Sequence, residues 1–185
     1  MHILIQETPN PNTLKFVIQN FILSKKGIYF FEKKNNLYKI ESKLANYIFT
    51  NIKNITSILI TKDFISITKD YNSRWSILKI KLSTVLNDFF MSGVTVINEN
   101  SKCNSDFNKS KYIDKKIKDL IDLKIRPSII SDGGDVIFQN YSNGNVSLKF
   151  YGACKGCPNM KQTLKNGIEN ILRYYFPEIK SVSSS

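Results

Sequence analysis

Cys154 and Cys157 are the residues whose type and spacing point most directly to chemistry, because two thiols separated by two residues can bind one soft metal centre. The same pair can close into a small disulfide ring, so zinc half-sites, redox pairs and iron–sulfur sites all use this spacing. Cys103 lies in a polar stretch without a second ligand nearby, and the single histidine, His2, lies at the N-terminus. We expect neither Cys103 nor His2 to bind metal.

The segments on either side of the pair predict a strand-to-helix loop. Residues 146–150 alternate apolar and polar side chains, and residues 136–141 are the predicted partner strand across an Asn-Gly turn. Pro158 suits the first position of a helix, and apolar residues at helical spacing follow it. We therefore expect Cys157 at the helix N-cap, where the partial positive charge of the helix start favours a thiolate over a thiol.

Several short runs around the pair are more specific than the two cysteines alone. In chain order they are Arg126-Pro127, Asp132-Gly133-Gly134-Asp135, Gly152-Ala153-Cys154-Lys155-Gly156-Cys157-Pro158, Thr163-Leu164-Lys165 and Gly167-Ile168-Glu169. Together they resemble the NifU C-terminal-type domain of the Nfu family of iron–sulfur cluster carriers. The resemblance implies that Cys154 and Cys157 are the metal ligands and hold the cluster. Gly152, Gly156 and Pro158 then shape the loop.

The first half of the chain carries a second pattern. It consists of Thr8-Pro9-Asn10-Pro11-Asn12-Thr13-Leu14-Lys15-Phe16, Lys43-Leu44-Ala45 with Ile48-Phe49, the run from Asp63 to Lys69, and Trp75 with the helix after it. These residues resemble the N-terminal domain of Nfu proteins, whereas residues 20–40 match it poorly. We expect this half to recognise partner proteins without chemistry of its own, and Trp75 to be a core residue.

Periodicity predicts an α+β fold with two small domains, the second an α-β-β-α unit. The domains are 1–90, of the Nfu N-terminal type, and 109–185, the cluster-binding domain, joined by a polar linker at 91–108. The predicted strands are 1–6, 14–18, 55–60 and 64–68, and the predicted helices are 41–52, 75–89 and 113–121. Strand-like pieces are expected within 21–40. Arg126-Pro127 should kink or end the third helix. We interpret Asp132-Gly133-Gly134-Asp135 as turn chemistry rather than as part of the cluster site.

Composition restricts the class of protein. The chain has 42% hydrophobic and 12% aromatic residues, as a globular protein does, and its three cysteines are too few for a secreted disulfide framework. It contains no run of about 18 apolar residues and no recognisable secretory signal or transit segment, so we expect no membrane association. These features suit either the bacterial cytoplasm or a mitochondrial or other organelle matrix.

The net charge of +12 could indicate a nucleic-acid partner. Residues 1–108 hold 14 Lys and Arg against 8 Asp and Glu, and residues 109–185 hold 13 against 7. The surplus is therefore spread over the chain, and no nucleic-acid-binding signature accompanies it. We expect a solvated lysine-rich surface and no nucleic-acid partner.

The number of ligands predicts a shared cluster. An iron–sulfur cluster is usually held by four protein thiolates, and one chain brings two, so two chains would complete the set with two-fold symmetry. The resemblance also implies a [4Fe–4S] cluster bridging a homodimer, received from assembly proteins and handed to apo-enzymes; whether a [2Fe–2S] form is used stays open. Such a carrier is not an enzyme. The alternatives are a thiol–disulfide oxidoreductase, which also uses CxxC at a helix start, and a structural zinc module.

Overall fold

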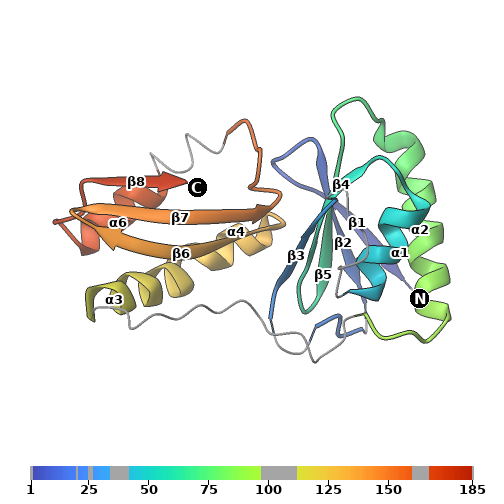
Figure 1. Ribbon diagram of the computed structural model, residues 1–185, viewed down its shortest axis with the longest axis horizontal. Coiled ribbons are helices and arrows are strands. Elements are labelled where there is room, and N and C mark those ends of the chain that lie inside the picture. The colour runs from blue at the N-terminus through green and yellow to red at the C-terminus, as the bar shows by residue number, and fades with distance from the viewer. Residues whose placement is uncertain are drawn as a thin grey trace. The chain divides into compact units, whose positions relative to one another are not determined.

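The computed structural model describes residues 2–19, 21–24, 27–33, 42–96, 112–159 and 167–184 (Figure 1). The chain separates into two compact units, Met1–Ser105 and Asp106–Ser185. Each unit has its own apolar core, and helices and strands are mixed in both, which confirms the predicted α+β class. Among the described residues, no helix is long and apolar enough to cross a membrane.

The first unit is an antiparallel sheet with two helices over one face (Figure 1). In spatial order the strands are β1 (Ile3–Glu7), β2 (Thr13–Ile18), β5 (Phe64–Lys69), β4 (Ile55–Ile60) and β3 (Tyr29–Glu32). The helices are α1 (Lys43–Asn51) and α2 (Trp75–Met91). Four strands and both helices match the predictions, and β3 is the strand formed within the weakly patterned residues 21–40.

Sequence alternation explains how this core forms. Leu14, Phe16 and Ile18 are buried on one face of β2, as the period of two requires. The register places Leu14 opposite Ile67 and Phe16 opposite Ile65, so the apolar face continues across the sheet. Trp75 packs against this core, as predicted, and its indole N–H donates to the carbonyl of Pro11 at 2.9 Å.

The packing of the first unit reaches beyond residue 90. Val96 is buried in the first core, and its carbonyl accepts a hydrogen bond of 2.8 Å from the hydroxyl of Ser42. The same hydroxyl accepts from the backbone N–H of Ala45 and caps α1. The first part of the predicted linker therefore belongs to this core, while Cys103 and the rest of that segment lie outside the described residues.

The second unit surrounds a hairpin. Its elements are α3 (Tyr112–Leu120), the π-helix η2 (Ile121–Ile125), α4 (Arg126–Ser131), β6 (Gly134–Ser142), β7 (Asn145–Gly152), α6 (Glu169–Tyr175) and β8 (Ser181–Ser184). The predicted hairpin is confirmed: β6 and β7 pair antiparallel, and Asn143 and Gly144 have φ values of 51° and 87° between them. Positive φ at both positions matches the right-handed twist of the strands.

Two predictions for this unit were incomplete. The sequence predicted that Arg126-Pro127 kinks or ends the helix before the hairpin. The helical segment does not end there, because η2 leads directly into α4. Pro127 lies in the first turn of α4, where a helix tolerates a residue that has no backbone N–H. The segment's buried stripe runs on at intervals of four residues, through Ile117, Ile121, Ile125 and Ile129. The last strand, β8, pairs parallel with β7 and was missed. Its Ser-Val-Ser-Ser sequence has a single apolar residue and so no readable alternation.

The segment after the cysteine pair is described only in part. Pro158 and Asn159 form a turn, residues 160–166 lie outside the described residues, and α6 follows from Glu169. The helix ends at Tyr175, before Pro177, as predicted. The prediction that it begins at Pro158, with Cys157 as its N-cap, therefore falls on the undescribed stretch.

Candidate functional site

The cysteine pair lies on a loop that begins where β7 ends. Gly152 closes the strand with φ of 61°, and the N–H of Lys155 donates back to its carbonyl at 3.1 Å. A second turn follows, in which the N–H of Cys157 donates to the carbonyl of Cys154 at 3.4 Å. Gly156 takes φ of 73° within this turn, a conformation that favours glycine. Neither cysteine forms a disulfide and both are half-buried, so two sulfur ligands belong to one short loop.

Gly134, the first residue of β6, packs directly against this loop. A Cβ atom there would lie 2.5 Å from Sγ of Cys154 and 3.2 Å from its Cβ, closer than side chains approach one another. The neighbouring Gly133, with φ of 79°, makes the turn and accepts a 3.1 Å hydrogen bond from the N–H of Ala153. The turn interpretation therefore holds for Gly133, whereas Gly134 is required because β6 must lie against Cys154.

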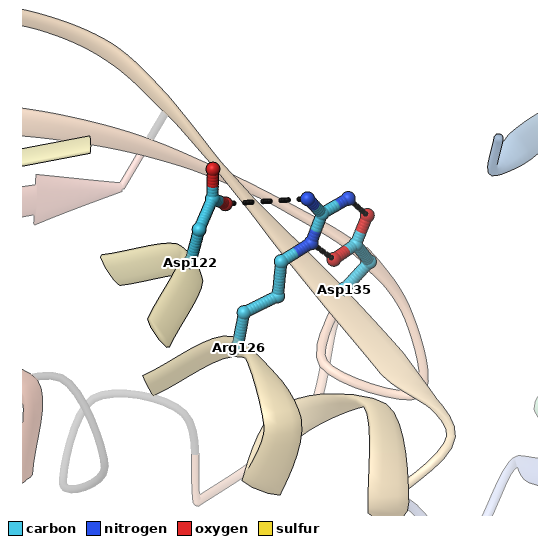
Figure 2. Close-up of polar contacts among 3 residues, drawn as sticks. All are labelled: Asp122, Arg126 and Asp135. Atoms are coloured by element: carbon cyan, nitrogen blue, oxygen red, sulfur yellow. Dashed lines mark hydrogen bonds and ion pairs between the residues drawn. The ribbon is translucent and has the colours of Figure 1, made fainter. Parts of the chain in front are cut away.

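An ion pair next to Gly134 in the sequence also helps to hold this region in position. Asp135 is fully buried, and Arg126 binds it with two parallel hydrogen bonds, Nε to Oδ1 at 2.7 Å and Nη2 to Oδ2 at 3.0 Å (Figure 2). Nη1 of Arg126 also reaches Oδ1 of the more exposed Asp122 at 3.2 Å. Hydrogen bonding to Asp135 raises the pKa of Arg126. The pair joins α4 to β6 at the residue after Gly134. Asp135 therefore links two elements, whereas the sequence predicted only a role in the turn.

The surroundings of Cys154 favour its protonated thiol over the charged thiolate. Burial raises the pKa of Cys154 to about 12, and the negative charges of Cys157, Asp132 and Asp135 add to the effect. The expectation that a helix start favours a thiolate at the pair depends on the stretch after Pro158 and stays a prediction. Without metal, Cys154 holds its proton at neutral pH, so a metal that binds there must displace that proton.

The donor set of this loop consists of sulfur atoms. Two sulfur atoms on a half-exposed loop are the ligands that iron–sulfur clusters take. Over the part of the chain that the structure describes, no group of three or more His, Cys, Asp and Glu residues could hold a metal ion. One described chain therefore offers two sulfur ligands at this loop, and the loop's exposure leaves room for more ligands from outside.

The comparisons with known proteins cover both units. Residues 3–93 match the family described as scaffold protein Nfu/NifU N terminal, and residues 117–183 match the NifU-like domain. The chain is 38% identical to the proteins named "NFU1 iron-sulfur cluster scaffold homolog, mitochondrial" of Drosophila persimilis and Drosophila virilis. These alignments include 98% of this chain but 64% and 61% of the two relatives, so the chain spans less than two thirds of their length.

A solved structure shows a more limited likeness. The solution NMR structure of the NifU-like protein from Saccharomyces cerevisiae is 27% identical, with a TM-score of 0.48, over 54% of this chain and 87% of that chain.

The two family matches correspond to the two units in order, an Nfu/NifU N-terminal domain followed by a NifU-like domain. The chain therefore belongs to the Nfu family.

Proposed function

We propose that this chain is an iron–sulfur cluster scaffold and carrier, which binds a [4Fe–4S] cluster between two protomers and delivers it to apo-enzymes. The observation that carries the proposal is the loop itself, on which Cys154 and Cys157 lie outside any disulfide and are partly accessible. The relatives from Drosophila persimilis and Drosophila virilis are named as iron–sulfur cluster scaffolds, which supports the same role.

The number of sulfur atoms supports a bridging site. A [4Fe–4S] cluster is held by four thiolates, and each protomer brings Cys154 and Cys157, so two protomers meet the requirement with identical loops. A [2Fe–2S] cluster also takes four thiolates, and the donor set alone accepts either. We propose the four-iron form.

The protonation of Cys154 supports a role in transferring a cluster rather than in holding one permanently. Cys154 must lose a proton that the apo-protein holds tightly, so loading is opposed by the protein, and release returns the thiol to its favoured state. Asp132 and Asp135 add negative charge near a site whose bound thiolates are also negative. The same raised pKa makes Cys154 a poor attacking thiolate, which weakens the alternative of a thiol–disulfide oxidoreductase. The proposal contains no catalytic step.

The partners and the compartment follow from the role. A carrier must meet assembly proteins that supply the cluster and apo-proteins that accept it. We assign this recognition to the first unit and the cluster to the second, in the predicted division 1–90 and 109–185. Because the relatives are named mitochondrial, we propose an organelle matrix as the place of action.

Anaerobic reconstitution of the full chain with ferrous iron and sulfide tests the proposal. We expect about four irons and four sulfides per two chains, with Mössbauer parameters of a [4Fe–4S] cluster. Stoichiometric zinc binding without sulfide incorporation, or iron bound without sulfide, would contradict it.

A further inference from the structure

A cavity in the first unit lies where α1 ends and α2 begins. Its volume is about 630 Å³. The lining residues come from the end of α1 and the turn after it, and from the turn before α2 and its first two turns. They are Asn51, Ile52, Lys53, Asn54, Asn72, Ser73, Arg74, Ile77, Leu78 and Lys81. None of them belongs to the cysteine loop, so the cavity is independent of the proposed cluster site.

The charge of this cavity has one sign. Lys53, Arg74 and Lys81 line it, and no Asp or Glu does. Within the described residues, no ion pair is formed by these three side chains. The acid nearest in sequence, Asp70, accepts the backbone N–H of Ser73 at 2.8 Å and so is engaged in the turn before α2. Three cations around one hollow attract a ligand with several negative charges.

The other lining residues are aliphatic side chains, three asparagines and one serine. They indicate that the ligand has aliphatic groups as well as negative charges. Ile52 and Leu78 are buried beneath the cavity, while Ile77 is 58% exposed at its edge. Ile80, one turn along α2, is 71% exposed and extends the aliphatic surface. A partner with carboxylates and an aliphatic side chain would satisfy both parts of this surface.

A nucleic acid fits the lining less well than a peptide. Proteins that bind single strands stack bases on aromatic side chains, and the ten lining residues include none. Three asparagines line the cavity. Asn51 and Asn54 donate their amide groups to the carbonyl of Tyr47 and the hydroxyl of Ser73, and their side-chain oxygens can accept from the N–H groups of a peptide backbone. Asn72 can both donate to and accept from such a backbone. An extended acidic peptide therefore matches the cavity in charge, apolar content and hydrogen-bonding groups.

We propose that this cavity is a docking site for an acidic segment of a partner protein, with Lys53, Arg74 and Lys81 pairing with its carboxylates and Ile77 contacting its aliphatic side chain. The inference rests on the proposed role of the first unit in partner recognition and gives that role a place and a chemistry. It involves neither thiol, so cluster loading and peptide docking can fail separately.

The test uses the full chain and a defined probe. A fluorescein-labelled peptide of alternating Glu-Glu-Leu triplets is titrated by fluorescence anisotropy at about 50 mM salt, beside the same peptide with Gln in place of Glu. We expect the acidic probe to bind at least tenfold more tightly than the neutral one. NMR shift changes should gather at residues 51–54 and 72–81.

A matched pair of variants separates docking from general attraction to a +12 chain. The cavity variant is Lys53→Glu, Arg74→Glu and Lys81→Glu; the control is Lys43→Glu, Lys62→Glu and Lys79→Glu, first-unit lysines that do not line the cavity. Both change the net charge equally. We expect at least a tenfold loss of affinity in the first and less than a threefold loss in the second, with unchanged thermal melting and iron loading in both.

Three results would overturn the proposal. Equal losses in the two variants would reduce the binding to net charge. No binding of the acidic probe to the unaltered chain would remove the site. Tighter binding of a single-stranded oligonucleotide, lost in the cavity variant, would reassign the site to nucleic acid. If the cavity variant misfolds, the NMR mapping on the unaltered chain decides between these results.

Discussion

The two units differ in the residues that their strands place against neighbouring elements. In the first unit, strand residues meet partners of their own kind, as where Phe16 of β2 lies opposite Ile65 of β5. In the second unit, β6 begins with Gly134, which allows no side chain against Cys154, and continues with the buried carboxylate of Asp135.

The comparison shows how the surroundings of the cysteine loop differ from the rest of the two sheets. In the first unit an apolar face runs across the central strands, and the buried Lys69 at its margin donates to Oδ1 of Asn12 at 2.8 Å. The second unit differs beside the cysteine loop, with a close glycine contact, a buried ion pair and a thiol held protonated. Such features cost stability and are retained where a site needs them.

The largest expected effect is loss of the thiols. We expect Cys154→Ser and Cys157→Ser each to abolish cluster binding, because a serine oxygen is a much poorer ligand than sulfur for a soft metal centre. Cys103→Ser should keep full loading. Iron and sulfide per chain after reconstitution provide the measurement. Loss of iron in Cys103→Ser alone would show that the ligands were assigned wrongly.

The next effect concerns the buried ion pair. Replacing Arg126 by Ala leaves the carboxylate of Asp135 buried without its partner, and we expect a loss of about 2–4 kcal/mol in the free energy of unfolding. The matched control is Asp122→Asn, which removes only the more exposed contact of the same arginine and should cost less than about 1 kcal/mol. Urea unfolding of both variants gives the comparison. Equal costs would mean that the buried pair contributes no more than the exposed one.

A smaller effect is expected from filling the space beside Cys154. The methyl group of Gly134→Ala would lie 2.5 Å from Sγ, so the thiol must move, at a cost of about 1–3 kcal/mol. Cluster loading should fall with it. Gly167→Ala is the control, since its Cβ would meet nothing within 4 Å. If Gly134→Ala loads iron like the unaltered chain, the close contact does not position the ligand.

The smallest change involves no mutation and probes the thiol itself. Because burial raises the pKa of Cys154 to about 12, little of it is thiolate at pH 8, and iodoacetamide should label it more slowly in the folded apo-protein than in urea. The folded rate should still be rising above about pH 10, where an ordinary thiol is almost fully ionised. Peptide mass spectrometry after timed quenching measures both rates. Equal labelling in the folded and unfolded protein would contradict the raised pKa.

The parts of the site that could be predicted were local in sequence. The hairpin followed from alternation and from Asn143-Gly144, and the ligand pair followed from two cysteines on one loop. The contact of Gly134 with Cys154 could not be predicted, because it joins residues twenty positions apart whose proximity depends on the register of β6 and β7.

Other missed features share this non-local origin. The pairing of the buried Asp135 depends on where α4 places Arg126. The raised pKa of Cys154 depends on the burial of its own side chain and, after Cys157, on Asp132 at the end of α4 and Asp135 in β6. A signal was available for Asp135, since an acid directly before a predicted apolar strand needs a cationic partner if the strand's burial includes it, and Arg126 precedes it by nine residues. The π-helix and β8 leave no such trace, because neither changes the apolar spacing enough to be seen.

The central claim is that the cluster and the dimer form together, since each protomer brings two thiolates to a site that needs four. Native mass spectrometry of the reconstituted chain, before and after a strong chelator, tests it most directly. We expect a species of two chains with about four irons that becomes mostly monomeric when the metal is removed. A four-iron cluster on a stable single chain, or a dimer unchanged by chelation, would contradict the bridging site.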